Sequence, residues 1–249
     1  MANYNSFCFE GHGLSEVTGA YDPGAVNGNF IENKIAEKIV NAAKSYLDGT
    51  SLKIHYDENN YEDNDLKGNS YSSKSGIVVH INAGKGSGVE IYVPSKEKYL
   101  TTDFEIVDRL SKLLSIPNRG VKSRDYDSEA TFKRANGVAL PYRDYYKEIR
   151  VAWEQGISLS LLEVGFIDTE DVYKIMDNID KIGFEVARYV AKNCDVDLKE
   201  PSKSIESSKK KIFYRVIAGS FSDRSRAEAR KKDLEIEGYD GVFLEAKEL

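Results

Sequence analysis

The segment Gly76-Ile77-Val78-Val79-His80-Ile81 is apolar at nearly every position, as expected for a strand buried on both faces of a sheet. Segments 31–47 and 170–192 flank it along the chain and repeat apolar residues at a helical spacing. Further strand-type and helix-type runs lie at 6–9, 52–56, 102–114, 146–155 and 157–164. This alternation predicts an α/β fold with a mixed or mostly parallel sheet flanked by helices.

The composition is that of a soluble globular chain. Of its 249 residues, 41% are hydrophobic and 31% are charged, which excludes collagen-like and disordered classes. No run approaches the roughly 18 apolar residues of a membrane span, and a net charge of −6 argues against nucleic-acid binding as the main role. Cys8 and Cys194 have no metal-site spacing, and we expect Cys8 to be a small buried hydrophobe. We therefore predict neither a membrane nor a nucleic-acid partner.

A change in composition divides the chain near residue 195. Residues 195–211 are rich in Lys, Ser, Glu and Pro, as is typical of a linker. We therefore predict a catalytic body over residues 1–194, a linker over 195–211 and a small module over 212–249.

The candidate catalytic residues lie where strands pass into loops. His12 follows the first strand, His80 closes the buried strand, and Glu32 opens the first helix. Glu163 is a charge within an otherwise apolar strand, which is costly unless something compensates for it. Long stretches without clear periodicity lie at 11–30, 57–75, 82–95 and 118–145. We expect these stretches to be loops, and those that follow strands to gather at the carboxyl edge of the sheet.

A series of short motifs surrounds these residues. The motifs are Gly11-His12-Gly13, Asp22-Pro23-Gly24-Ala25, Glu32, His80-Ile81-Asn82-Ala83, Gly88-Val89-Glu90, Asn118-Arg119-Gly120-Val121-Lys122 and Leu162-Glu163-Val164-Gly165-Phe166-Ile167. Each is weak alone, but their order and their strand and helix context resemble the zinc-dependent N-acetylmuramoyl-L-alanine amidases of the amidase_3 type. The resemblance extends from residue 7 to about residue 192.

The resemblance implies the roles of four side chains. In that family the residues matching His12, Glu32 and His80 bind zinc, and the residue matching Glu163 is catalytic. Two imidazoles and one carboxylate suit Zn²⁺ and leave a position open for water or substrate. Glu163 would act as general base and then as general acid. The implied reaction is hydrolysis of the amide bond between N-acetylmuramic acid and L-alanine in peptidoglycan.

Other polar residues near the motifs are assigned supporting roles. His55 matches no ligand motif, and we interpret it as a structural or surface histidine. Asp22 is expected to shape a turn, and Glu90 to contact peptide or hold its loop. The loop 13–22 and the segment 122–147 are longer than the family's pattern, which leaves the substrate-contacting residues open.

The tail has a βαβ outline. Residues 213–221 and 241–246 alternate like strands, and a helix-type run lies between them. The pattern resembles the start of a SPOR domain, a family that binds peptidoglycan. It covers about half of such a domain, so we predict that two tails pair into one sheet and make a homodimer. A module that docks on its own body is the alternative.

The combined prediction is a two-part cell-wall lysin. The amino terminus lacks the basic and apolar regions of a signal peptide, so we expect the protein in the host cytoplasm before lysis, as a phage endolysin. A bacterial autolysin or sporulation hydrolase is the second setting. Two other functions stay open: a zinc peptidase that cuts elsewhere in the stem peptide, and a catalytically inactive wall-binding protein.

Overall fold

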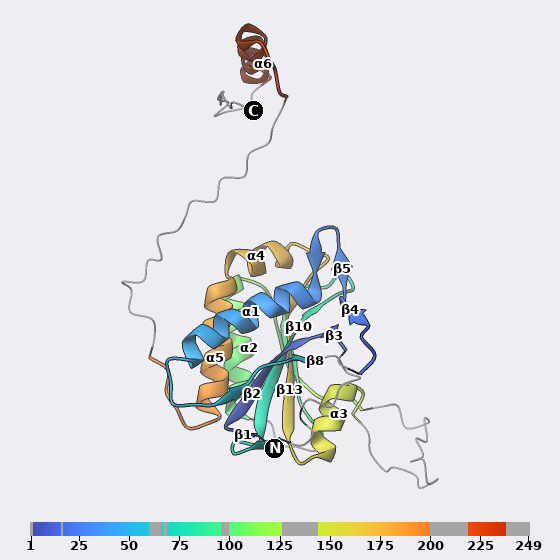
Figure 1. Cartoon of the computed structure of the whole chain (residues 1–249), viewed down its shortest axis with the longest axis vertical. Helices are drawn as coiled ribbons and strands as arrows, with labels where there is room; N and C mark the ends of the chain where they lie inside the picture. The colour runs from blue at the N-terminus through green and yellow to red at the C-terminus, as the bar shows by residue number, and fades with distance from the viewer. Residues whose placement is uncertain are drawn as a thin grey trace. The chain divides into compact units, whose positions relative to one another are not determined.

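The computed structural model of the chain describes residues 2–15, 17–59, 66, 69–95, 100–125, 144–199 and 219–237 (Figure 1). The chain divides into two compact units, Met1–Lys199 and Glu200–Leu249. In the second unit, the described part contains helix α6 (Arg224–Ile236), where the sequence predicts the tail helix. The side chain of Asp223 caps α6 by accepting hydrogen bonds from the backbone amides of Ser225 and Arg226.

A mostly parallel sheet forms the centre of the first unit. Its strand order is β12–β11–β13–β10–β2–β7, and β8 also pairs with β2. The strands are β2 (Ser6–Gly11), β7 (Ile54–His55), β8 (Glu58–Asn59), β10 (Ser75–Asn82), β11 (Val89–Tyr92), β12 (Asn118–Lys122) and β13 (Ser158–Phe166). Among the described strands of this sheet, every pair is parallel except β11 with β13. The predicted mixed or mostly parallel sheet is therefore confirmed.

Helices cover both faces of this sheet (Figure 1). Helices α1 (Glu32–Leu47), α2 (Thr101–Leu114) and α5 (Ile179–Lys192) share one apolar cluster with one face, and α4 (Asp171–Asp177) adds to it. Helix α3 (Lys147–Glu154) packs with a second cluster on the opposite face, which we call the α3 face. Alternate strand residues point to opposite faces, so this division follows from the sequence pattern of each strand.

The register of the two central strands places polar side chains on the α3 face. Val78 of β10 and Leu161 of β13 belong to the α3-face cluster and are paired with each other. Two residues further along, His80 is paired with Glu163. Because side chains repeat their face every second residue, His80 and Glu163 both lie on the α3 face near the carboxyl ends of their strands.

Several short strands lie outside the main sheet. Strand β1 (Asn3–Tyr4) pairs in parallel with β9 (Ser70–Tyr71). Two small antiparallel pairs, β3 (Gly13–Leu14) with β4 (Tyr21–Asp22) and β5 (Val26–Asn27) with β6 (Phe30–Ile31), occupy the stretch before α1. The sequence predicts a loop over 11–30, and these hairpins give that segment a defined shape beside the carboxyl edge.

Several predictions about individual elements are wrong. The stretches expected as loops over 11–30 and 57–75 contain short strands, β3 to β5 in the first and β8 and β9 in the second. Loops are predicted over 82–95 and 118–145, yet these segments contain β11 and β12. The apolar run of β11 is short and is interrupted by the charged residue Glu90. The cations that neutralise Glu90 lie in β12, so each strand contains charged residues and neither shows the apolar pattern by which a strand is recognised. The single helix-type run over 170–192 is two helices, because the chain breaks at Asn178 between α4 and α5.

Some predictions fall on residues that the structure does not describe. These are residues 213–218 of the tail strand predicted over 213–221, whose residues 219–221 are described and are not in a strand, together with the tail strand over 241–246, residues 200–211 of the predicted linker, and residues 126–143 of the long segment after β12. In the part of the chain that is described, no helix combines the length and apolar character needed to cross a bilayer.

The close approach of α1 and α5 can be tested at Gly183. A Cβ atom at Gly183 would lie 2.4 Å from Cβ of Ala42 and 2.8 Å from the backbone nitrogen of Ala43. Gly183→Ala should therefore force the helices apart and lower the free energy of unfolding by about 1–3 kcal/mol, as measured by urea denaturation. Gly49→Ala is the matched control, since the nearest atom to its new methyl would be 3.5 Å away. Equal effects from the two substitutions would contradict the packing.

Candidate metal centre

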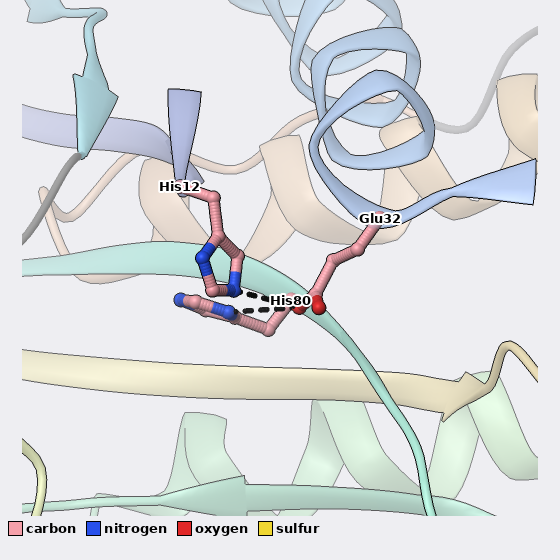
Figure 2. A group of neighbouring side chains, drawn as sticks. All are labelled: His12, Glu32 and His80. Carbon is pink, nitrogen blue, oxygen red and sulfur yellow. Dashed lines mark hydrogen bonds and ion pairs between the residues drawn. The ribbon is translucent and has the colours of Figure 1, made fainter. Parts of the chain in front are cut away.

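Three side chains from distant segments meet at the carboxyl edge of the sheet (Figure 2). His12 lies in the turn between β2 and β3, Glu32 is the first residue of α1, and His80 lies near the end of β10. Oε1 of Glu32 is 3.3 Å from Nε2 of His12 and 3.0 Å from Nδ1 of His80. One ligand atom from each residue lies within 4.8 Å of the others, which is close enough to share a metal ion.

Each imidazole in this group lies between two carboxylates. The nitrogen of His12 that faces away from Glu32, Nδ1, is 2.9 Å from Oδ2 of Asp22. The corresponding nitrogen of His80, Nε2, is 3.2 Å from Oε2 of Glu148. One nitrogen of each ring thus faces Glu32, where a metal could bind, while the other is held by a second carboxylate, an arrangement common around metal-binding histidines.

Backbone amides fix the Glu32 carboxylate between the rings. The amide of Ala25 donates to Oε2 at 2.8 Å, and the amide of Ile81 donates to Oε1 at 3.1 Å. One donor comes from the loop before α1 and the other from β10. The loop before α1 and strand β10 therefore fix the orientation of the Glu32 carboxylate without the help of a bound ion.

Two glycines allow the chain to pass close to the ligands. A Cβ atom at Gly11 would lie 2.3 Å from the ring of His80, and one at Gly24 would lie 2.6 Å from the ring of His12. Gly24 also has φ of 66°, a left-handed conformation that favours glycine. His12 itself has φ of 65°, which turns its side chain off the end of β2 and toward the edge of the sheet.

The proximity of opposite charges shifts the protonation of the whole group. Burial opposes ionisation of Glu32, but hydrogen bonds from His12 and His80 outweigh it and hold the pKa of Glu32 far below its usual value. Burial also lowers the pKa of both imidazoles, yet the neighbouring carboxylates outweigh it and raise the pKa of His12 and, to a greater extent, of His80. The site thus has a strong preference for positive charge beside Glu32.

Glu163 differs from the other acids because it is buried and one of its carboxylate oxygens has no hydrogen-bond partner among the described residues. Its relative exposure is 9%, and the oxygen concerned is Oε2. Burial raises its pKa to about 8; the charge of His80 opposes this shift, and the nearby acids Glu32, Glu90 and Glu148 add to it. A carboxyl group with a pKa near neutrality beside a candidate metal site can exchange protons at physiological pH.

A hollow of about 330 Å³ opens over these side chains. Its polar lining includes the three candidate ligands and Glu163, and its wall is completed by Asn82, Tyr145, Tyr146 and Glu148 among others. The candidate ligands and the candidate base therefore share one cavity that a substrate can enter. This common cavity is what the motif order alone cannot demonstrate.

Glu90 is occupied by a separate set of contacts. It is paired with Glu163 in the register of β11 and β13, and it accepts hydrogen bonds from Arg119 at 2.6 Å, from Asn82 at 3.0 Å and from Lys122. These contacts hold the pKa of Glu90 below its usual value against the effect of burial. Glu90 therefore ties the antiparallel end of the sheet together, in agreement with a loop-holding role.

The remaining residues named from the sequence lie as follows. His55 is away from the hollow, with Nδ1 2.7 Å from the hydroxyl of Tyr71 and its ring stacked 4.6 Å from that of Tyr4. Asp22 accepts a hydrogen bond from the amide of Gly24, which is the turn contact expected of it, and it also holds His12. Cys8 is fully buried in the apolar cluster opposite the α3 face.

Glu148 is the site residue that sequence reasoning misses. It belongs to none of the motifs, and it follows the long segment after β12 whose contacts the sequence leaves open. The sequence offers only a weak sign that Glu148 belongs to the site: it is an acidic residue next to Ile149 and one turn from Ala152, the two buried positions of α3. Only the packing of α3 on the sheet shows that this acid reaches His80.

A family model described as N-acetylmuramoyl-L-alanine amidase, Amidase_3, matches residues 10–181. The chain belongs to the amidase_3 family. A SPOR domain model matches residues 189–245. Both resemblances inferred from the motifs are thereby confirmed, and membership supports amidase activity on peptidoglycan. The three candidate metal ligands of this amidase lie in the first half of the matched residues.

Several known proteins are similar to the chain in sequence or in fold. The chain is 23% identical over 248 residues to a sporulation-specific N-acetylmuramoyl-L-alanine amidase of Bacillus subtilis strain 168, covering 96% of this chain and 83% of the relative. An N-acetylmuramoyl-L-alanine amidase from Clostridium difficile 630 has a similar fold, with a TM-score of 0.53 and 16% identity over 77% of this chain and 98% of that one. Cwp6 from Clostridium difficile gives a TM-score of 0.56 at 22% identity, over 76% of this chain but only 29% of Cwp6.

The buried acid of this amidase should make the metal-free protein less stable as pH rises. The pKa of Glu163 is raised from 4.5 to about 8, so its contribution to stability is fully present below pH 4.5 and is lost as pH rises through about 8. The raised pKa of His80 acts in the same direction. Glu163→Gln should therefore lose less free energy of unfolding than the wild type between about pH 5 and 8. Urea denaturation in the presence of a chelator measures both slopes, and identical slopes would disprove the assignment.

Proposed function

We propose that the protein hydrolyses the amide bond between N-acetylmuramic acid and L-alanine in peptidoglycan, with zinc held by His12, Glu32 and His80. The observation that carries this proposal is the convergence of these three side chains in one cavity with Glu163. Family membership supplies the substrate class and the type of bond.

The donor set suits zinc. Two imidazole nitrogens and one carboxylate oxygen are the ligand types of catalytic zinc sites, and three protein ligands leave a position for water or substrate. Asp22 and Glu148 hold the outer nitrogens of the two rings, and the amides of Ala25 and Ile81 hold Glu32. Zinc bound there would polarise the scissile carbonyl and lower the pKa of a water molecule.

Glu163 is proposed as the proton-transfer residue. Its Oε2 atom has no hydrogen-bond partner among the described residues, and it is the atom available to take a proton from water and pass it to the departing amine of L-alanine. A divalent cation on the neighbouring ligands would favour its ionised form, which counteracts the burial that raises its pKa. The carboxyl group is therefore placed to act as a base first and as an acid afterwards.

Digestion of purified cell wall tests this function. With zinc present, the wild type should release new amino groups of alanine without new reducing sugars, and a chelator should abolish the release. Glu163→Gln should slow the reaction by about 10²–10⁴-fold while the wall is still bound. Glu170→Gln is the control, since Glu170 is exposed at the start of α4.

The identity of the new end groups separates the remaining functions. Amino groups from residues inside the stem peptide would support the alternative of a zinc peptidase, and wall binding without any cleavage would support an inactive binding protein. New reducing ends would contradict both hydrolytic assignments. Equal activity of the wild type and Glu163→Gln would remove Glu163 from the proposed mechanism.

The biological setting is also proposed. The setting favoured by the sequence is a phage endolysin that accumulates in the host cytoplasm and acts at the wall. A sporulation hydrolase is the second candidate, because the Bacillus subtilis sporulation-specific amidase matches 96% of this chain, tail included. Expression timed to phage lysis would support the first setting, and expression during sporulation the second.

The tail is proposed as a wall-binding and dimerising module after a linker over 195–211. The SPOR match supports wall binding, and the described part of the tail exposes the apolar side chains of Phe221 and Ile236. Truncation after Asp197 should weaken wall binding and reduce the mass measured by light scattering to that of a monomer. Cleavage of small soluble wall fragments should be unchanged. A full-length chain that is monomeric at micromolar concentration would rule out the dimer and favour docking of the tail on its own body.

A further inference from the structure

The side chain of Glu148 is largely shielded from solvent on the α3 face, and no amidase motif includes this residue. It lies in the first turn of α3, its side chain has a relative exposure of 9%, and its Oε2 atom is 3.2 Å from Nε2 of His80. It also lines the hollow that contains the candidate ligands. Its position therefore connects α3 directly to the proposed metal centre.

The packing of α3 determines where Glu148 points. Ile149 and Ala152, the buried side chains of α3, join the α3-face cluster and anchor the helix on β13. Tyr146, the residue just before α3, has its ring 4.7 Å from the ring of Tyr92 on β11. Because Ile149 and Ala152 anchor the helix and Tyr146 anchors the residue before it, the first turn of α3 lies beside His80 at the carboxyl end of β10.

Helix stability alone does not explain the burial of this acid. A glutamate in the first turn of a helix is favourable because it lies near the positive end of the helix dipole, but an exposed side chain achieves the same effect. Removing a carboxylate from water is costly unless a hydrogen bond or opposite charge compensates for it. The contact with His80 supplies that compensation.

The contact also determines which nitrogen of His80 can bind a metal. A carboxylate only accepts hydrogen bonds, so Nε2 of His80 must carry the hydrogen that faces Glu148. The other nitrogen, Nδ1, is 3.0 Å from Oε1 of Glu32 and donates a hydrogen bond there in the metal-free protein; it is the nitrogen whose lone pair would become available to a metal once that hydrogen is lost. Asp22 holds Nδ1 of His12 in the equivalent way and leaves Nε2 toward Glu32.

We propose that Glu148 is a positioning residue that accepts the Nε2 hydrogen of His80 and so presents Nδ1 as the zinc ligand. The inference rests on the proposed zinc site but assigns a residue outside the three ligands and Glu163. Glu148 contacts neither the candidate ligand atom nor Glu32 in any hydrogen bond of the described residues. Its effect on the metal passes through the imidazole ring.

Zinc affinity of the full chain tests the proposal without any activity measurement. The dissociation constant is measured by competition with a chromogenic chelator for the wild type, Glu148→Ala, Glu148→Gln and Glu154→Ala. Glu148→Ala should bind zinc about 10–100-fold more weakly. Glu148→Gln should lose less, because its amide oxygen still accepts the hydrogen. Glu154→Ala is the matched control, since Glu154 is an exposed acid at the far end of the same helix.

A spectroscopic measurement separates this role from a merely structural one. In the zinc-loaded wild type and in Glu148→Gln, ¹⁵N spectra should show the His80 tautomer with hydrogen on Nε2. A tautomer with hydrogen on Nδ1, or zinc affinities of both variants equal to or above that of the wild type, would overturn the proposal. If Glu148→Ala does not fold, as judged by circular dichroism, Glu148→Gln decides the outcome. Failure of the wild type to bind zinc would instead refute the proposed function.

Discussion

The site depends on one carboxylate, that of Glu32, held between two imidazoles at the edge of a sheet. Burial opposes its charge, and hydrogen bonds from His12 and His80 more than compensate. Two backbone amides, from the loop before α1 and from β10, fix its orientation. The close approach at Gly11 and Gly24 exists because these contacts require the loop, the helix start and the strand end to meet within a few ångströms.

Four buried or half-buried acids near this point have different environments and therefore different roles. Glu32 faces both imidazoles, and Glu148 faces the outer nitrogen of His80. Glu90 is neutralised by Arg119 and by a lysine of β12. Glu163 has no such partner for Oε2 among the described residues, and burial raises its pKa to about 8. Two neighbouring acids whose pKa values are shifted in opposite directions, as those of Glu32 and Glu163 are, are what a proton-transfer site requires.

Much of the fold is predictable because its strongest elements carry local patterns. The apolar run of β10 and the helical spacing of α1 and α5 are visible in the sequence, and each is present in the structure. The short strands β11 and β12 are not, because their polar residues are stabilised by partners about thirty positions away. The antiparallel placement of β11 beside β13 likewise follows from pairing between segments and not from any local pattern.

The sequence by itself determines the family, and its motifs single out four candidate side chains, because the order of motifs along the chain can be read without knowing any contact. The tertiary structure alone decides that His12, Glu32 and His80 meet, that Oε2 of Glu163 has no hydrogen-bond partner among the described residues, and that Glu148 reaches His80. The physical reason is that hydrogen bonding, burial and pKa depend on distances through space. Those distances are set by strand register and by the packing of α3, neither of which is encoded in any single segment.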